Sequence, residues 1–248
     1  MNRFTQALTG IILGLFGLPG LNAQEVITPL YSNPRAAAYH QHEKAEKKST
    51  AEKLLELPFF DDFSDTFVIP DTGSWSDASA FINNQYCIDP VSNGVATLDA
   101  LNYDGSMYPT AVIAPSTFVA DHLTSHPIRL EYPASDSIYL SFLYQPQGMG
   151  DMPDVKDSLL VDFYDPALGS WINVWGIPGD TLHPFMHALI PVIEDRFLTS
   201  GFRFRFRNRA SLPRNSDYPD KRANVDHWNV DYVRLDRNRF ASDTLLRD

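Results

Sequence analysis

Residues 202–207 constrain the fold of this chain most, because they read Phe-Arg-Phe-Arg-Phe-Arg without interruption. In a β-strand successive side chains point to opposite faces, so the three Phe share one face and the three Arg the other. The pattern predicts a strand whose Phe face belongs to a core. The Arg face is either solvated, paired with acids on neighbouring strands, or part of a surface for an acidic ligand. Pairing is favoured, because the chain has a net charge of −11.

Short apolar or alternating segments recur through the rest of the chain, and Gly, Pro, Asn and Asp separate them. No long segment shows the 3.6-residue period of a helix. Asn83-Asn84 is expected to form a tight turn between two of these segments. Short strands at such spacing indicate an antiparallel sandwich or barrel. The predicted strands are 66–69, 80–82, 85–88, 95–98, 128–132, 137–144, 158–164, 171–175 and 187–193.

Two strand-like segments, 57–64 and 226–235, bracket this β-rich region, and both contain acidic residues. The first and last strands of a sandwich often lie side by side. We therefore expect an all-β, antiparallel β-sandwich of the jelly-roll type over residues 57–238, followed by a C-terminal tail at 239–248.

The same pairing would bring Asp61 and Asp62 of the first strand close to Asp231 of the last. Calcium takes six to eight oxygen ligands from carboxylates, backbone carbonyls and water. These three Asp are therefore predicted metal ligands of a structural Ca²⁺, with loop carbonyls completing the shell. The alternative is that one Asp is a solvated edge charge and another pairs with Arg234 or Arg237.

The N-terminus has the pattern of a secretory signal peptide over residues 1–23. Arg3 precedes a short apolar run at 11–18, and cleavage is expected after Ala23. The run is too short to span a bilayer comfortably, although a retained anchor is the alternative. After cleavage we expect no stable membrane insertion and a secreted, periplasmic or cell-surface protein. Residues 24–56 are rich in charged helix formers and are predicted to be a charged linker or a marginal helix.

Composition limits the partners and the redox chemistry of the chain. An acidic exported protein is a poor ligand for nucleic acid or anionic lipid, so neither is expected as a partner. Cys87 is the single cysteine, so the chain cannot form an internal disulfide. Because it lies in an apparent strand, we expect a buried and inert thiol rather than a reactive one.

The order of several motifs resembles MAM-like jelly-roll modules and the adhesin-type modules of Bacteroidota secreted or cell-surface proteins. MAM domains usually carry disulfide cysteines, so the single cysteine here favours the bacterial adhesin-type branch. The resemblance covers residues 57–236 and implies an extracellular module of the binding kind. The motifs are the acidic-aromatic strand 59–63, Trp75, the corner 123–128, the strands 139–145, 157–163 and 171–175, the aromatic-arginine strand, and the ending 228–233.

Candidate ligand-binding residues lie in loops, where a rigid sandwich usually carries recognition. Gln147 and Asp151 belong to the Gly- and Pro-rich loop 145–154, for which an ordinary ordered connection is the alternative. Tyr103 and Tyr108 are aromatic residues in a loop context and are expected to be exposed. Trp171 and Trp228 lie in strand patterns that look buried, so they are expected in the core.

These observations favour a non-catalytic binding or adhesion module that acts outside the cell, with a glycan or a surface protein as partner. The alternatives are a carbohydrate-binding module of a secreted protein and a structural subunit of a Bacteroidota envelope or secretion assembly. No nucleophile elbow or paired-carboxylate glycosidase signature is present in the sequence, so an enzyme is not expected. The sequence does not determine the oligomeric state.

Overall fold

The structure is a computed structural model, which describes residues 32–43, 53–113, 116–212 and 224–243. The predicted signal peptide and parts of the predicted linker and tail lie outside these residues. Within the predicted linker, Pro34–Glu43 forms helix α2. The described residues include no helix that is both long and apolar enough to cross a membrane.

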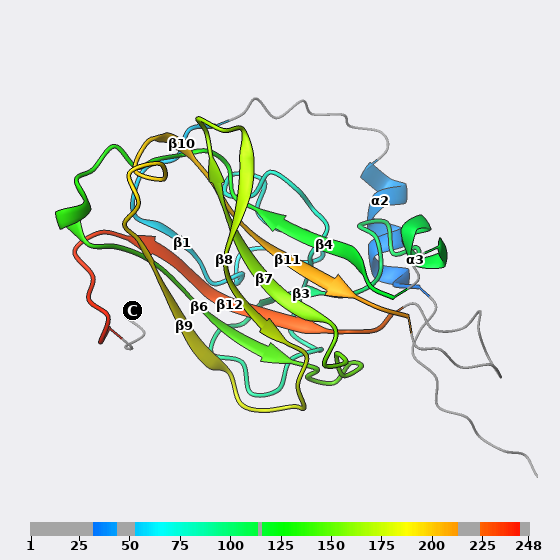
Figure 1. The fold of residues 1–248 in the computed structure, drawn as a ribbon. Coiled ribbons are helices and arrows are strands. Elements are labelled where there is room, and N and C mark those ends of the chain that lie inside the picture. The colour runs from blue at the N-terminus through cyan, green and yellow to red at the C-terminus, as the bar shows by residue number, and fades with distance from the viewer. Residues whose placement is uncertain (1–31, 44–52, 114–115, 213–223, 244–248) are drawn as a thin grey trace, which may run out of the picture.

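The described residues form two stacked antiparallel sheets, which confirms the predicted β-sandwich of jelly-roll type (Figure 1). The first sheet has the order β2 (Phe81–Asn83), β3 (Val95–Leu98), β12 (Trp228–Asp236), β6 (Ile138–Pro146) and β9 (Met186–Val192), and β1 (Phe59–Asp61) pairs with β12. The second has the order β4 (Phe118–Thr124), β11 (Phe204–Ala210), β7 (Ser158–Asp165) and β8 (Ser170–Pro178). Shorter elements are the pair β5 (Ile128–Arg129) and β10 (Ser200–Phe202), helix α3 (Pro109–Ile113) and the 3₁₀ turn η1 (Ala134–Asp136).

The first and last strands lie side by side, as predicted. Phe59 of β1 pairs with Leu235 of β12 in antiparallel register. Further along β12, Trp228 pairs with Leu98 of β3 and also with Pro146 of β6. β12 therefore has partners on both edges and ties the two ends of the domain together.

The Phe face of β10 and β11 lies in the core, again as predicted. Phe202, Phe204 and Phe206 are fully buried between the two sheets. The ring of Trp75 lies 5.7 Å from that of Phe204, and its Nε1 donates a hydrogen bond to Asp61 Oδ2 at 2.6 Å. The indole thus joins the core to the first strand.

Several predicted strands are wrong or shorter than expected. Segment 66–69 contributes a single bridge, from Val68 to Ile82, and 128–132 is a strand only at its first two residues. The predicted hairpin turn at Asn83-Asn84 is also wrong. Asn83 ends β2, and its Oδ1 accepts hydrogen bonds from the backbone N–H of Gln85 and Tyr86, so the side chain holds a loop where a strand was expected.

Cys87 lies in that loop and is buried, as predicted. Burial raises the pKa of its thiol to about 11, so the thiolate is scarce at neutral pH. Burial and the raised pKa both favour low reactivity of the thiol.

We predict that Phe206→Ala will lower the free energy of unfolding by about 3–5 kcal/mol, because removing a buried Phe side chain leaves a cavity. The ring of Phe206 lies 4.8 Å from that of Phe142 on the opposite sheet, so the cavity would open between the layers. Denaturant unfolding measures the change. Phe240→Ala is the control, since Phe240 is 70% exposed, and it should change the value by less than about 0.5 kcal/mol. Equal effects of the two variants would contradict this core assignment.

Candidate functional site

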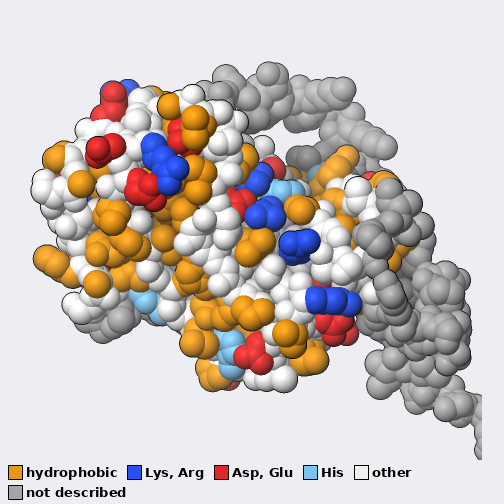
Figure 2. All heavy atoms as spheres, in the orientation of Figure 1, with side chains coloured by type: hydrophobic (Ala, Val, Ile, Leu, Met, Phe, Trp, Pro, Cys, Tyr) orange, Lys and Arg blue, Asp and Glu red, His pale blue; other side chains and the backbone are white. Residues whose placement is uncertain are grey.

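The outer face of the second sheet carries the Arg side chains of β11. Arg205 and Arg207 share the carboxylate of Asp162 on the neighbouring strand β7, with Nε–Oδ2 distances of 2.9 and 2.8 Å. The predicted pairing of the Arg face with an acid is therefore confirmed for Arg205 and Arg207. Arg209 is exposed and donates from its Nε to Thr117 Oγ1. Figure 2 shows Lys and Arg side chains in a diagonal band across the middle of this face.

A β-bulge in β8 decides which aromatic side chains reach this face. Asn173 pairs with Asp162, whereas Trp175 pairs with Val161, so one extra residue of β8 lies between them. Such a bulge reverses the alternation of side chains beyond it. Trp171 and Asn173 consequently lie on the outer face, while the ring of Trp175 packs inward against Phe142 at 5.1 Å. The expectation that Trp171 belongs to the core was wrong, and the ring is only half-buried.

Trp171 and Tyr164 form an aromatic pair on this outer face. They are paired residues of β8 and β7, and their ring centroids are 5.2 Å apart. The guanidinium of Arg205 lies over the indole, with its Cζ 4.3 Å from the ring centroid, a cation–π distance. Asn173 Nδ2 donates to Asp162 Oδ1 at 3.0 Å and to the carbonyl of Val161, so the amide holds the bulge in place.

Cationic side chains act on both titratable groups in the middle of this face. Burial, and then the charges of Arg205 and Arg207, lower the pKa of His122 to about 4, so the imidazole is neutral at pH 7. Although burial alone would raise the pKa of Asp162, its hydrogen bonds from Arg207, Asn173 and Arg205 hold it below its ordinary value. Asp162 is therefore an ionised acceptor among cationic donors.

We call this surface the Arg–Trp face and define it by its members. They are His122, Asp162, Tyr164, Trp171, Asn173, Arg205, Arg207 and Arg209. The period of two in residues 202–207 predicted the positions of Arg205 and Arg207, but it did not extend to Arg209. The outward position of Trp171 was not predicted, because no feature of residues 171–175 marks the bulge.

The predicted metal ligands lie near one another but are already hydrogen-bonded. Asp61 accepts from Trp75 and from the N–H of Phe63. Asp62 Oδ1 accepts from Ser64, and Asp231 accepts from Ser92 Oγ and the N–H of Tyr232. None of the three pairs with Arg234 or Arg237, which bind Asp236 and Asp136 instead.

Burial, opposed by hydrogen bonds from Ser92 and Tyr232, raises the pKa of Asp231 to about 6, and the charge of Asp62 adds to the rise. Through the described ranges, no group of three or more His, Cys, Asp or Glu side chains could hold a metal. Calcium at these residues stays a prediction.

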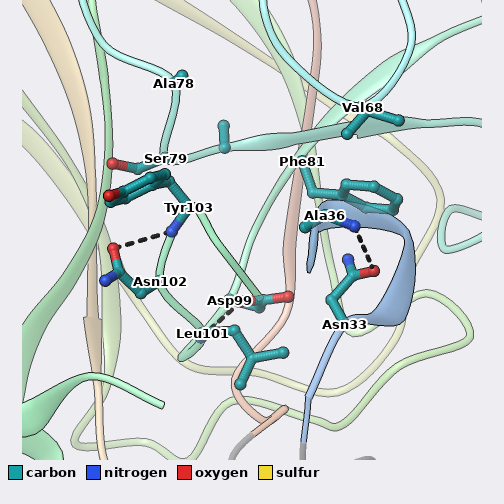
Figure 3. A pocket seen from close by; sticks show the side chains of 11 residues that line it. Asn33, Ala36, Val68, Ala78, Ser79, Phe81, Asp99, Leu101, Asn102 and Tyr103 are labelled. Carbon is teal, nitrogen blue, oxygen red and sulfur yellow. Dashed lines mark hydrogen bonds between the residues drawn. The ribbon is translucent and has the colours of Figure 1, made fainter. Parts of the chain in front are cut away.

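The predicted ligand residues Tyr103 and Tyr108 lie beside helices α2 and α3. Tyr103 is 49% exposed and lines a cavity of about 10 Å³ with Asp99 and Asn33 (Figure 3). This volume holds about one water molecule. The expectation that Tyr108 is exposed was wrong. It is half-buried, and its hydroxyl donates to Asp121 Oδ1 at 2.8 Å, so its polar end faces the protein interior.

A larger cavity, of about 170 Å³, lies between the start of α2 and the end of β2. Arg35, Asn83 and Tyr86 are among its lining residues. Asn83 uses its amide for the protein, because Nδ2 donates to Thr97 Oγ1 and Oδ1 holds the following loop. Both polar atoms of the Asn83 amide thus bind other parts of the protein, which leaves the side chain little capacity to bind a ligand in this cavity.

The predicted ligand residues Gln147 and Asp151 lie in the loop between β6 and β7, which is anchored to His227 at the start of β12. The N–H of Gln147 donates to the carbonyl of His227, and the N–H of His227 donates to the carbonyl of Asp151. The N–H of Asp151 in turn donates to Nδ1 of His227. This loop is an ordered connection, and whether its side chains bind a ligand stays a prediction.

Two pairs of buried carboxyl groups lie away from the Arg–Trp face. Asp121 Oδ2 accepts from the N–H of Asp99, and burial raises the pKa of Asp99 to about 7. In the second pair, Ser211 bridges Asp157 and Asp226 through its hydroxyl and its N–H. Burial, and then the charge of Asp157, raise the pKa of Asp226 to about 8. The side chains of both pairs are enclosed in the interior.

The pH dependence of stability tests the second pair. Between the ordinary Asp pKa and about 8, folded Asp226 keeps a proton that the unfolded chain has released, so its contribution to stability falls as the pH rises. Asp226→Asn removes this group, so the free energy of unfolding of the variant should rise relative to the wild type from pH 5 to 8. The slope has an upper limit of about 1.4 kcal/mol per pH unit.

Denaturant unfolding at several pH values gives that difference. Asp195→Asn, at an exposed position, is the matched control and should show no such trend. A difference between Asp226→Asn and the wild type that does not change with pH would rule out the raised pKa.

Thermal unfolding tests the predicted calcium. A cation at Asp61, Asp62 and Asp231 should raise the Tm in millimolar Ca²⁺ relative to EDTA, because a ligand that binds only the folded state stabilises it. Asp231→Asn should abolish the shift, whereas Asp195→Asn should keep it. Identical melting of the wild type in Ca²⁺ and EDTA would remove these residues as a metal site.

Comparison with known proteins gives weak similarities only. No protein-family model matches the chain, and no curated protein matches it. Among solved structures, a family 29 carbohydrate-binding module is 10% identical over 76% of this chain and 97% of that chain, with a TM-score of 0.39. A family 22 xylan-binding domain from Paenibacillus barcinonensis is 8% identical over 78% and 100%, with a TM-score of 0.37. An adhesin domain of Lys-gingipain from Porphyromonas gingivalis is 10% identical over 58% and 75%, with a TM-score of 0.32. Similarity this low supports no argument about what the chain binds.

Proposed function

We propose that this chain is a non-catalytic glycan-binding module that acts outside the cytoplasm and binds saccharide on the Arg–Trp face. The observation that carries the proposal is the half-exposed Trp171–Tyr164 pair, placed by the bulge beside polar side chains. Saccharide recognition combines an apolar platform for the sugar ring with a few polar groups that fix its hydroxyls. Asn173 and Arg205 supply such groups next to the rings, and the buried Asp162 holds both in place.

The enclosed carboxyl pairs favour binding without catalysis. A glycosidase needs two carboxyl groups about 5–9 Å apart on either side of the scissile bond, in a cleft that admits the sugar. Asp99 borders a cavity of about 10 Å³, which has no room for a sugar ring. Asp157 and Asp226 are 1% and 2% exposed. These two pairs of acids with raised pKa are thus on the inside, away from the Arg–Trp face.

The location outside the cytoplasm rests on the signal peptide read in residues 1–23. Membership of the MAM-like or adhesin-type modules of Bacteroidota, with adhesion to a surface protein, is the finer form of the same proposal. It rests on the order of motifs described from the sequence. Neither the location outside the cytoplasm nor the family membership alters the proposal that the ligand binds on the second sheet.

Replacing the aromatic platform tests the proposed function. We expect Trp171→Ala to weaken binding to the best glycan of a polysaccharide panel at least tenfold, about 1.4 kcal/mol, because the ring's contact area is lost. Tyr164→Ala should act in the same direction. Affinity electrophoresis finds the glycan, and titration calorimetry measures the dissociation constants.

Phe240→Ala is the matched control, because it removes an aromatic ring that is 70% exposed outside the two sheets. It should bind like the wild type. Thermal melts confirm that each variant folds. A panel with no bound glycan, or binding that survives both Trp171→Ala and Tyr164→Ala, would refute glycan recognition on this face.

A further inference from the structure

We infer that the saccharide bound on the Arg–Trp face is acidic, with carboxylate or sulfate groups that bind Arg205, Arg207 and Arg209. The inference rests on the proposed function and adds the chemical class of the ligand. It is carried by the hydrogen-bond donors and the charge of this face, as follows.

The guanidinium groups of Arg205, Arg207 and Arg209, here called the Arg row, have N–H donors that form no hydrogen bond within the described residues. Asp162 binds Nε of Arg205, and Nε and Nη2 of Arg207. Arg209 uses its Nε for Thr117. Within the described ranges, both terminal nitrogens of Arg205, Nη1 of Arg207 and both terminal nitrogens of Arg209 have no hydrogen-bond acceptor. Each guanidinium is therefore anchored by its inner part and presents N–H groups to a ligand, as bidentate recognition of an anion requires.

The charge of the face is not balanced by its own acids. One carboxylate, Asp162, serves two guanidiniums, and Arg209 has no ion pair among the described residues. Asp77 also interacts electrostatically with Arg205, and burial raises its pKa to about 6. In the part of the chain that the structure describes, Asp162 is thus the one carboxylate that forms ion pairs with these three guanidiniums. An anionic ligand would supply the missing negative charge.

The spacing of the row suits a chain with repeated anionic groups. Alternate residues of a strand lie about 7 Å apart, so Arg205, Arg207 and Arg209 form a line of donors along β11. Trp171 and Tyr164 lie on the two neighbouring strands β8 and β7. A sugar ring over the aromatic pair could place its anionic substituents on the line of guanidiniums.

The aromatic pair and Asn173 favour a saccharide over a phosphate chain on the same surface. Asp162 is 1% exposed and its oxygens already accept from the two Arg and from Asn173, so it anchors the donors and does not itself contact a ligand. Asn173 is exposed, and its amide is a polar group of the kind that binds sugar hydroxyls. The rings of Trp171 and Tyr164 suit the apolar face of a sugar, which a phosphate chain lacks.

The test compares acidic glycans with neutral forms of the same sugars. The probes are an array of uronate-rich, sulfated and neutral polysaccharides, followed by calorimetry with an acidic oligosaccharide and its methyl-esterified or desulfated form. Single-stranded DNA and inorganic polyphosphate are the non-saccharide anions. We expect the acidic oligosaccharide to bind at least tenfold more tightly than its neutral form, and more weakly as the salt concentration rises.

Substitutions locate the contacts. Arg209→Gln and Arg207→Gln should each weaken binding of the acidic oligosaccharide about tenfold, the usual effect of losing a hydrogen bond to a charged group. Arg207→Lys should restore part of the loss, since it restores the charge without the fork. Arg237→Gln is the control of equal charge change, at an exposed site that follows β12 in the other sheet, and should bind like the wild type. Because Arg209 is exposed, we expect Arg209→Gln to fold normally. It therefore tests the inference even if Arg207→Gln unfolds.

The outcomes separate this inference from the function on which it rests. Tight binding of neutral glycans, with loss in Trp171→Ala but not in the Arg variants, would overturn the acidic ligand and leave glycan binding intact. Equal binding of DNA or polyphosphate would also overturn it, because the site would then be a general anion surface. No binding to any saccharide would overturn both proposals.

Discussion

Strand β11 sets both the core and the proposed binding surface of this protein, because its side chains alternate between two faces. It lies between β4 and β7 in the second sheet. Phe204 and Phe206 point inward and contact the ring of Trp75, while Arg205 and Arg207 point outward and bind Asp162. Burial of the Phe rings fixes the strand, and the fixed strand determines where the guanidiniums lie. The positions of the Arg donors are thus a consequence of core packing.

Two irregularities in the second sheet change which face some side chains occupy, compared with a strict alternation along each strand. The bulge in β8 sends Trp171 outward and Trp175 inward, although an even alternation would place both on one face. A register shift between β11 and β4 pairs Arg207 with His122 but Arg209 with Val119. In that part of β4 the carboxyl group of Asp121 is buried, where Tyr108 and Asp99 satisfy it. A half-buried, outward-facing indole and a buried carboxyl pair both accompany breaks in the ladder.

The sequence predicts the features that depend on local period and misses those that depend on distant partners. The Phe and Arg faces and the two-sheet architecture follow from period-two patterns and regular turns. The pairing of β1 with β12 is a distant contact that was still predictable, because the first and last strands of a sandwich often lie side by side. Strand β4 was missed because Asp121 and His122 interrupt its apolar pattern, and only Tyr108, Asp99 and the Arg row explain how they are accommodated. The outward position of Trp171 was missed because a bulge leaves no signal in residues 171–175.

The acidic composition and the cationic face are compatible, because charge acts locally in salt solution. The net charge of −11 counts every carboxyl group as ionised. Burial raises the pKa of Asp99 to about 7 and of Asp226 to about 8, so part of that formal charge is absent at neutral pH. The Debye length is about 8 Å at physiological ionic strength, so exposed acids farther away are largely screened from a ligand on β11. Such a ligand responds mainly to three guanidiniums and Asp162. The negative net charge of the whole protein disfavours binding of large polyanions. The Arg side chains along β11, in contrast, determine whether a small anionic ligand can bind to this face.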